Sequence, residues 1–143
     1  MPKKNTDFVK LKPPNQPTTY TPEQLKEFAA CARDPIYFME KFLFVQHPTR
    51  GKIPFTAYEF QKDLVKTYND HRNVIAMIPR QSGKTTTAAA FLLWYATFNN
   101  DMTILIAANK FKAASEIMSR IKYAYEELPN HIRAGIVDYN VQS

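Results

Sequence analysis

Features that define several other classes of protein are rare or missing in this sequence. The chain has a single cysteine, Cys31, which excludes an internal disulfide framework and fits a reducing compartment. The longest apolar run, residues 88–96, is far too short to span a bilayer. Lys3 and Lys4 are not followed by an apolar stretch, so we expect no secretory signal. The sequence therefore predicts neither a disulfide-stapled domain nor a membrane protein.

The composition suits a folded domain with a polyanionic partner. Of the 143 residues, 45% are hydrophobic and 13% are aromatic, which is enough for a buried core in one domain. The net charge of +6 favours nucleic acid as the partner. The basic residues form no dense run, so a solvated basic surface explains the charge equally well. In the N-terminal tail they include Lys3, Lys4, Lys10 and Lys12, and between residues 50 and 72 they are Arg50, Lys52, Lys62, Lys66 and Arg72.

The first half of the chain predicts a tail followed by a helical segment. Residues 1–20 are basic and rich in proline, which is typical of an extended tail that is ordered only where it docks. Within residues 21–71, Thr21-Pro22-Glu23-Gln24 has the cap, the proline and the glutamine of a helix start. Asp34-Pro35 opens a second helix. Residues 45–55 predict a short hairpin or loop, and residues 57–69 a third helix.

The second half, residues 72–143, has the pattern of an α/β fold. Residues 73–78 and 103–108 are short apolar runs that suit strands buried on both faces, and residues 135–139 could begin a third strand. Helices are predicted between them, at about 83–98 and 110–128. Strands that alternate with helices predict a parallel sheet with helices packed on its faces.

A phosphate-binding loop is predicted between the first strand and its helix. The loop is Pro79-Arg80-Gln81-Ser82-Gly83-Lys84-Thr85. Backbone N–H groups at a helix N-terminus, together with the helix dipole, favour phosphate. Gly83 lets the backbone approach closely, Lys84 would neutralise the β- and γ-phosphates, and Thr85 would ligate Mg²⁺. The general pattern has a glycine five positions before Gly83, where this chain has Ile78, so the strand–turn–helix context carries the assignment.

The loop and its flanks resemble the large terminase subunit of T-even-type tailed phages, a DNA-packaging ATPase. In that family Arg-Gln-x-Gly-Lys-Thr replaces the glycine-led loop. The similar segments are Asp34-Pro35-Ile-Tyr37-Phe38, Pro54-Phe55, Tyr58-Glu59-Phe60-Gln61, Pro79-Arg-Gln-Ser-Gly-Lys-Thr-Thr86, Ile104-Leu-Ile-Ala-Ala-Asn109-Lys110, Glu127-Leu128-Pro129 and Gly135-Ile-Val137. The resemblance implies the P-loop NTPase type of parallel sheet, preceded by the helical segment.

The resemblance also implies a role for each matching residue. Arg80 and Lys84 match catalytic positions, with Arg80 sensing the γ-phosphate. Gln61 matches the glutamine that reads adenine, and Phe60 stands where a tyrosine is usual and would pack on the base. Thr85 is the metal ligand. The implied nucleotide-binding set is Phe60, Gln61, Pro79, Arg80, Gln81, Ser82, Gly83, Lys84, Thr85 and Thr86. From the sequence alone, Gln61 could equally be a solvent-facing helix residue, and Arg80 a generic arginine on the phosphate side or on the surface.

The implied function is ATP-driven packaging of double-stranded DNA into a prohead. The implied cofactors are ATP and Mg²⁺, and the implied partners are DNA, the portal protein and the small terminase subunit. The protein would work as an oligomeric motor in the host cytoplasm, docked on the prohead. The family's Walker B Asp and catalytic Glu end an apolar strand, and no such strand ends in Asp-Glu here, since Asp138 is followed by Tyr139. The family's nuclease domain also finds no match. We therefore expect the opening piece of a longer protein, with little ATP turnover by residues 1–143 alone.

Two other functions fit the same loop. An ATP-dependent helicase or restriction-type translocase also places a glutamine upstream of Gly-Lys-Thr. A nucleotide-binding piece with no activity of its own is the third hypothesis.

Overall fold

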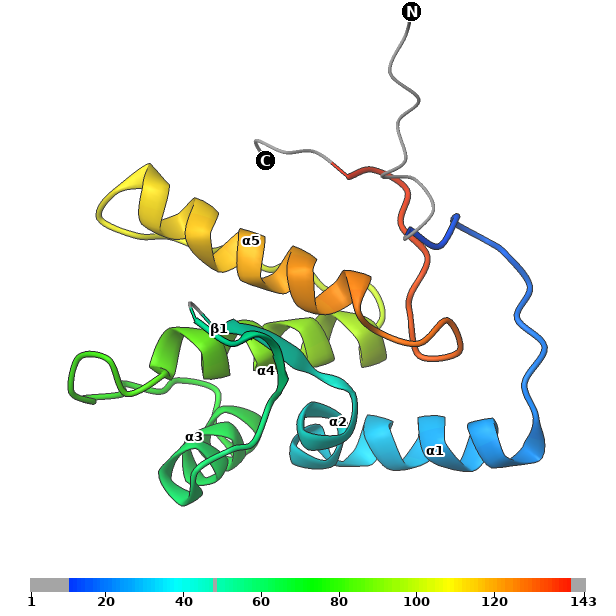
Figure 1. Ribbon diagram of the computed structural model, residues 1–143, viewed down its shortest axis with the longest axis horizontal. Coiled ribbons are helices and arrows are strands. Elements are labelled where there is room, and N and C mark those ends of the chain that lie inside the picture. Colours follow the sequence, from blue (N-terminus) through cyan, green and yellow to red (C-terminus); the bar gives the residue numbers. More distant parts are fainter. Residues whose placement is uncertain (1–10, 48, 140–143) are drawn as a thin grey trace, which may run out of the picture.

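A computed structural model describes residues 11–47 and 49–139. Helix α4 lies at the centre of the fold, with α5 alongside it on one side and α1, α2 and α3 on the other (Figure 1). None of the helices in the described residues is long and apolar enough to cross a membrane. In chain order the elements are α1 (Pro22–Arg33), α2 (Pro35–Phe42), β1 (Phe44–His47), β2 (Gly51–Pro54), α3 (Glu59–Asp70), α4 (Lys84–Phe98) and α5 (Phe111–Glu126).

The first two helices begin where their capping residues predict. The Thr21 hydroxyl accepts a hydrogen bond from the Gln24 N–H at 3.2 Å, and Gln24 Oε1 accepts one from the Thr21 N–H at 3.0 Å. This reciprocal pair satisfies two N–H groups that a helix start leaves unpaired. At the start of α2, Asp34 Oδ1 accepts from the N–H groups of Ile36 and Tyr37. The prediction of both helix starts is confirmed.

The hairpin expected in residues 45–55 is also present. Strands β1 and β2 pair antiparallel, with Val45 opposite Ile53. The Phe55 N–H donates to the Leu43 carbonyl at 2.9 Å, which extends the pairing past the end of β2. Phe55 and Leu43 are buried, so the hairpin is anchored on the core at its open end.

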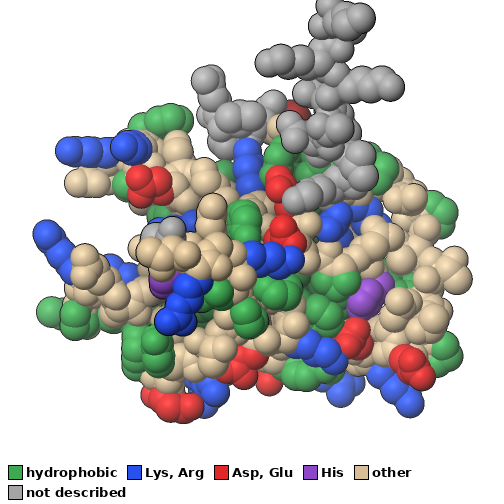
Figure 2. Space-filling model, in the orientation of Figure 1, with side chains coloured by type: hydrophobic (Ala, Val, Ile, Leu, Met, Phe, Trp, Pro, Cys, Tyr) green, Lys and Arg blue, Asp and Glu red, His purple; other side chains and the backbone are tan. Residues whose placement is uncertain are grey.

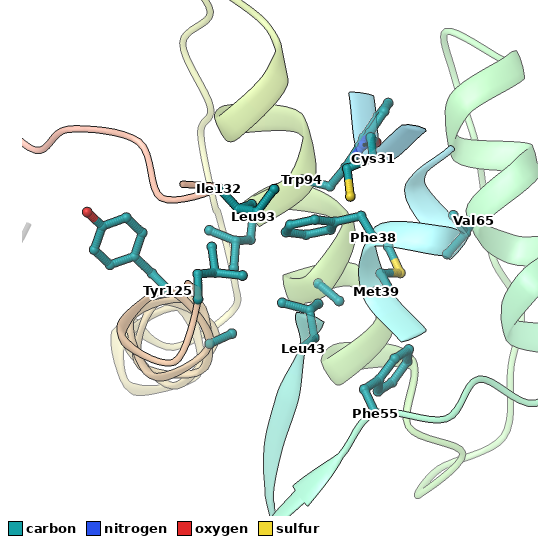
Figure 3. Close-up of a cluster of buried hydrophobic side chains, with 13 residues drawn as sticks. Cys31, Phe38, Met39, Leu43, Phe55, Val65, Leu93, Trp94, Tyr125 and Ile132 are labelled. Atoms are coloured by element: carbon teal, nitrogen blue, oxygen red, sulfur yellow. Dashed lines mark hydrogen bonds between the residues drawn. The ribbon is translucent and has the colours of Figure 1, made fainter. Parts of the chain in front are cut away.

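One hydrophobic core joins the helices on both sides of the boundary predicted near residue 71. Phe38 of α2 lies among Trp94, Leu93 and Met39 (Figure 3). Trp94 Nε1 donates to the Cys31 carbonyl at 2.8 Å, and this buried bond ties the last turn of α1 to α4. Burial raises the pKa of the Cys31 thiol to about 12, as expected for a small core residue.

The part of the tail that the structure describes docks on the C-terminal segment. The Ile136 N–H donates to the Lys12 carbonyl at 2.9 Å, and Lys12 Nζ donates to the Asn130 carbonyl at 3.2 Å. Lys12 is buried, and burial followed by the nearby charge of Arg133 lowers its pKa. Leu11 packs against the core. Lys3, Lys4 and Lys10 lie outside the described residues.

The expected parallel sheet is not formed in the described residues, where the hairpin is the only sheet. Residues 73–78, 103–108 and 135–139 contain no strand. No backbone hydrogen bond among the described residues joins 73–78 to 103–108. Ile75 and Met77 are each 94% exposed and Leu105 is 89% exposed, so burial on both faces was a wrong prediction. The physical reason is that parallel strands need paired neighbours and helices on both faces. Here even the better covered side chains of these segments are only partly buried, namely Val74, Ile78, Ile104 and Ile106.

Candidate functional site

The loop before α4 is a tight turn with two residues in the left-handed region. Gln81 has φ 62° and Gly83 has φ 78°. The Ser82 hydroxyl donates to the Pro79 carbonyl at 2.8 Å and closes the turn. In Figure 1 this loop protrudes beyond the helices at the beginning of α4. A side chain at φ near 80° is strained, so the glycine at position 83 is a conformational requirement.

The beginning of α4 leaves backbone donors without partners inside the helix. Gly83 is the N-cap and has no side chain to cap the helix, and the first turn contains no acidic residue. The first N–H groups of any helix have no intrahelical acceptor, and the helix dipole places partial positive charge there. Thr87 fixes the other side of the cap, since its N–H and its hydroxyl both donate to the Gly83 carbonyl, at 2.9 and 3.1 Å.

Lys84 folds back over the loop. Its Nζ donates to the carbonyls of Ile78 and Pro79, at 3.2 and 3.4 Å. The ammonium group and the uncapped helix end therefore belong to the same turn of chain. An anion held by the helix end could take over the hydrogen bonds that Lys84 now gives to the loop carbonyls.

Helix α3 brings Gln61 against the loop. Gln61 is 4% exposed, so the alternative of a solvent-facing residue is wrong. Its Oε1 accepts from the Tyr58 N–H at 3.0 Å, and its Nε2 donates to the Ser82 carbonyl at 3.3 Å. The sequence placed Gln61 near the loop by resemblance, and the structure shows this proximity without showing what it binds.

Two aromatic rings stand beside Gln61 at the start of α3. Tyr58 is 69% exposed and Phe60 is 43% exposed. Their rings stack, with centroids 6.0 Å apart and planes 8° from parallel. Exposed stacked rings offer an apolar face to a flat ligand. Tyr58 belongs to the motif that carried the resemblance, but it was not singled out as a site residue.

The remaining predicted residues are spread around the loop. Arg80 and Gln81 are exposed, whereas Thr85 and Thr86 are partly buried in the first turn of α4. Arg120 of α5 donates from Nη1 to the Thr86 hydroxyl at 2.9 Å. Both residues line a cavity of about 260 Å³ between β1, α4 and α5. Sequence reasoning missed Arg120, because its contact depends on how α5 packs against α4.

These observations define a class of site: a tight turn with Gly-Lys-Thr, an uncapped helix N-terminus and a lysine over the turn, which is the arrangement of an anion-binding loop. Residues 75–138 match the family described as terminase large subunit, T4likevirus-type, N-terminal. This match confirms the resemblance to large terminase subunits over residues 75–138. The match covers the loop from Pro79 to Thr85, α4 and α5. Helices α1–α3, and with them Phe60 and Gln61, lie outside it.

Proposed function

We propose that the loop binds the phosphates of ATP, and that the chain is the ATP-binding part of a DNA-packaging motor. The observation that carries the proposal is the uncapped N-terminus of α4 with Lys84 folded over the same turn. Phosphate oxygens would accept from the N–H groups of the first turn, and Lys84 would move from the carbonyls of Ile78 and Pro79 to the β- and γ-phosphates. The first change gives a charged acceptor to donors that have no partner inside the helix. The second replaces the neutral carbonyl acceptors of Lys84 by charged ones, which strengthens those hydrogen bonds.

The residues of the first turn also fit a magnesium ion that arrives with the nucleotide. The Thr85 hydroxyl is an oxygen ligand of the kind Mg²⁺ prefers, and it is the residue that would hold the ion. When bound, the ion neutralises charge on the phosphate oxygens. The described residues contain no cluster of three or more His, Cys, Asp or Glu that could hold a metal ion.

The base would lie on the side of α3. Phe60 and Tyr58 offer stacked, exposed rings at the start of α3, next in sequence to Gln61, and we propose that the adenine ring packs there. Phe60 provides this contact without the hydroxyl of the tyrosine that is usual at its position.

The choice of a terminase and of its partners in this proposal rests on the family match. The match over residues 75–138 favours a terminase over a helicase or a restriction-type translocase. Double-stranded DNA, the portal protein and the small terminase subunit are the proposed partners, in the cytoplasm of the infected host and at the prohead. On the face shown in Figure 2, Lys and Arg side chains lie among acidic and hydrophobic ones rather than in one patch, so we assign no DNA-binding surface to this face.

We also propose that residues 73–78, 103–108 and 135–139 occupy strand positions of a P-loop type of parallel sheet. The alternation of the partly buried Ile104 and Ile106 with the exposed Leu105 supports this proposal. Pairing with further strands would satisfy their backbone groups, and a second layer of helices would cover the exposed side chains.

Stabilisation by nucleotides tests the proposed phosphate recognition. A ligand that binds only the folded state raises the free energy of unfolding by about 2.7 kcal/mol when its concentration is 100 times its Kd. In a thermal-shift assay with Mg²⁺, we expect ATP to raise the Tm by several degrees, ADP by less, and AMP hardly at all. If AMP stabilised the chain as much as ATP, or if ATP had no effect, phosphate recognition by this loop would be wrong.

A further inference from the structure

Gln61 makes hydrogen bonds in two directions from a buried position. Its Oε1 accepts from the backbone of its own helix start, at Tyr58, and its Nε2 donates to the Ser82 carbonyl in the loop. Helix α3 thus holds one particular peptide group of the loop, the one between Ser82 and Gly83. The prediction that Gln61 reads adenine gives no account of this bond.

The held peptide group is the one that leads into α4. A trans peptide is planar, so its C=O and its N–H point in opposite directions. Because the Ser82 carbonyl points at Gln61, the Gly83 N–H points away from α3. The packing here is close, since a Cβ placed on Gly83 would lie 2.6 Å from Gln61 Nε2. Gln61 therefore fixes the orientation of the Gly83 N–H, at the N-cap of the helix whose first N–H groups are unpaired.

We infer that Gln61 is a positioning residue for the phosphate loop: by holding the Ser82 carbonyl, it keeps the Gly83 N–H directed at the bound phosphates. This inference rests on the proposed function of the loop. It gives Gln61 an effect on phosphate affinity that needs no base. Phe60 directly precedes Gln61 in α3, so a base that packs on the Phe60 ring would contact the same turn of helix that holds the loop.

The two roles of Gln61 are separated by the choice of ligand. A residue that only reads the base affects ATP and leaves inorganic triphosphate unchanged. A residue that positions the loop affects both ligands by the same factor. The substitution Gln61→Met keeps the length of the side chain and removes the donor to Ser82.

The chain contains a matched control in Gln24. This residue also occupies the third position of a helix and accepts from the backbone N–H of its own helix start at 3.0 Å. It lies on α1 and is partly buried. Gln24→Met removes the same capping bond from a place where no loop is held, and therefore isolates the contribution of the Ser82 contact.

The experiment is calorimetric titration of the wild-type chain and both variants with Mg²⁺–triphosphate and Mg²⁺–ATP. We expect Gln61→Met to weaken both ligands by about tenfold, the effect of roughly one hydrogen bond, and Gln24→Met to change neither. The Gly83 amide provides a second readout, because with three glycines in the chain its ¹⁵N–¹H signal is readily assigned. Its shift should move in Gln61→Met and not in Gln24→Met.

Wild-type affinity for triphosphate in Gln61→Met, with a loss for ATP alone, would overturn the inference and leave Gln61 as a base reader. If Gln61→Met did not fold, Gln61→Glu would carry the test, because it keeps the acceptor for Tyr58 and lacks the donor to Ser82. Failure of the proposed function is distinguishable: it would show as the absence of triphosphate binding by the wild-type chain.

Discussion

Replacing Gly83 by alanine is expected to weaken triphosphate binding by roughly 30- to 150-fold. At φ 78° an alanine costs about 1–2 kcal/mol, and its Cβ would push away Gln61 Nε2, which costs about 1 kcal/mol for the lost hydrogen bond to Ser82. The loop would relax to another conformation, and binding would have to restore the original one against about 2–3 kcal/mol. Calorimetric titration with Mg²⁺–triphosphate measures the loss.

Gly51 provides the control for this substitution. It also has a positive φ, of 69°, but a Cβ added there would meet nothing within 4 Å. Gly51→Ala should therefore lower the stability of the chain by a similar backbone cost and leave triphosphate affinity unchanged. If Gly83→Ala bound triphosphate as well as Gly51→Ala does, the loop would not be the phosphate site.

Replacing Arg80 by alanine is expected to separate nucleotide binding from hydrolysis. Arg80 is exposed on the loop, and a guanidinium is always charged and offers several donors for a γ-phosphate. In an ATP-hydrolysing protein that carries this segment, Arg80→Ala should leave ADP affinity close to that of the wild type. It should lower the rate of phosphate release by about 10³-fold or more, as the loss of an arginine finger does.

Arg72 is the matched control for Arg80, since it is also an exposed arginine and lies upstream of the loop. Arg72→Ala should release phosphate at the wild-type rate. A near-normal rate in Arg80→Ala would identify Arg80 as a surface arginine, the alternative that the sequence left open.

The helices were predictable because their signals are local. Thr21, Asp34 and the prolines that follow them determine where α1 and α2 begin, and the hydrogen bonds that these caps make depend on residues two or three positions away. The helix after Gly83 was predicted for the same reason. Such contacts require no knowledge of how the chain packs at longer range.

The sheet was not predictable in the same way. An apolar run such as residues 73–78 indicates that its side chains favour a buried position. It contains no information on whether adjacent strands and helices are present to bury them. In the described residues, Met77 and Leu105 have no cover on one side and their segments have no paired neighbour. The prediction of strands in these segments therefore failed on the pairing partners that a strand needs.

The candidate site likewise has a part that local sequence predicts and a part that depends on packing between distant segments. Residues 79–83 form the expected turn and Lys84 begins α4, because the glycine, the lysine and the helix are adjacent in sequence. The bond between Gln61 and Ser82 spans 21 residues, and that between Arg120 and Thr86 spans 34. Both depend on the packing of α3 and α5 against α4. Resemblance could place Gln61 near the loop, but only the structure shows that the amide holds the loop backbone.

The most direct test of a phosphate-binding loop is the affinity of Lys84→Ala for inorganic triphosphate in the presence of Mg²⁺. A charge-assisted hydrogen bond contributes about 1.5–3 kcal/mol, so calorimetry should find binding weakened by roughly 10- to 100-fold. Lys112→Ala, an exposed lysine in the first turn of α5, should bind as the wild type does. Equal affinity of wild type, Lys84→Ala and Lys112→Ala would contradict the account, because phosphate would then be held without Lys84, whose ammonium group lies over the loop.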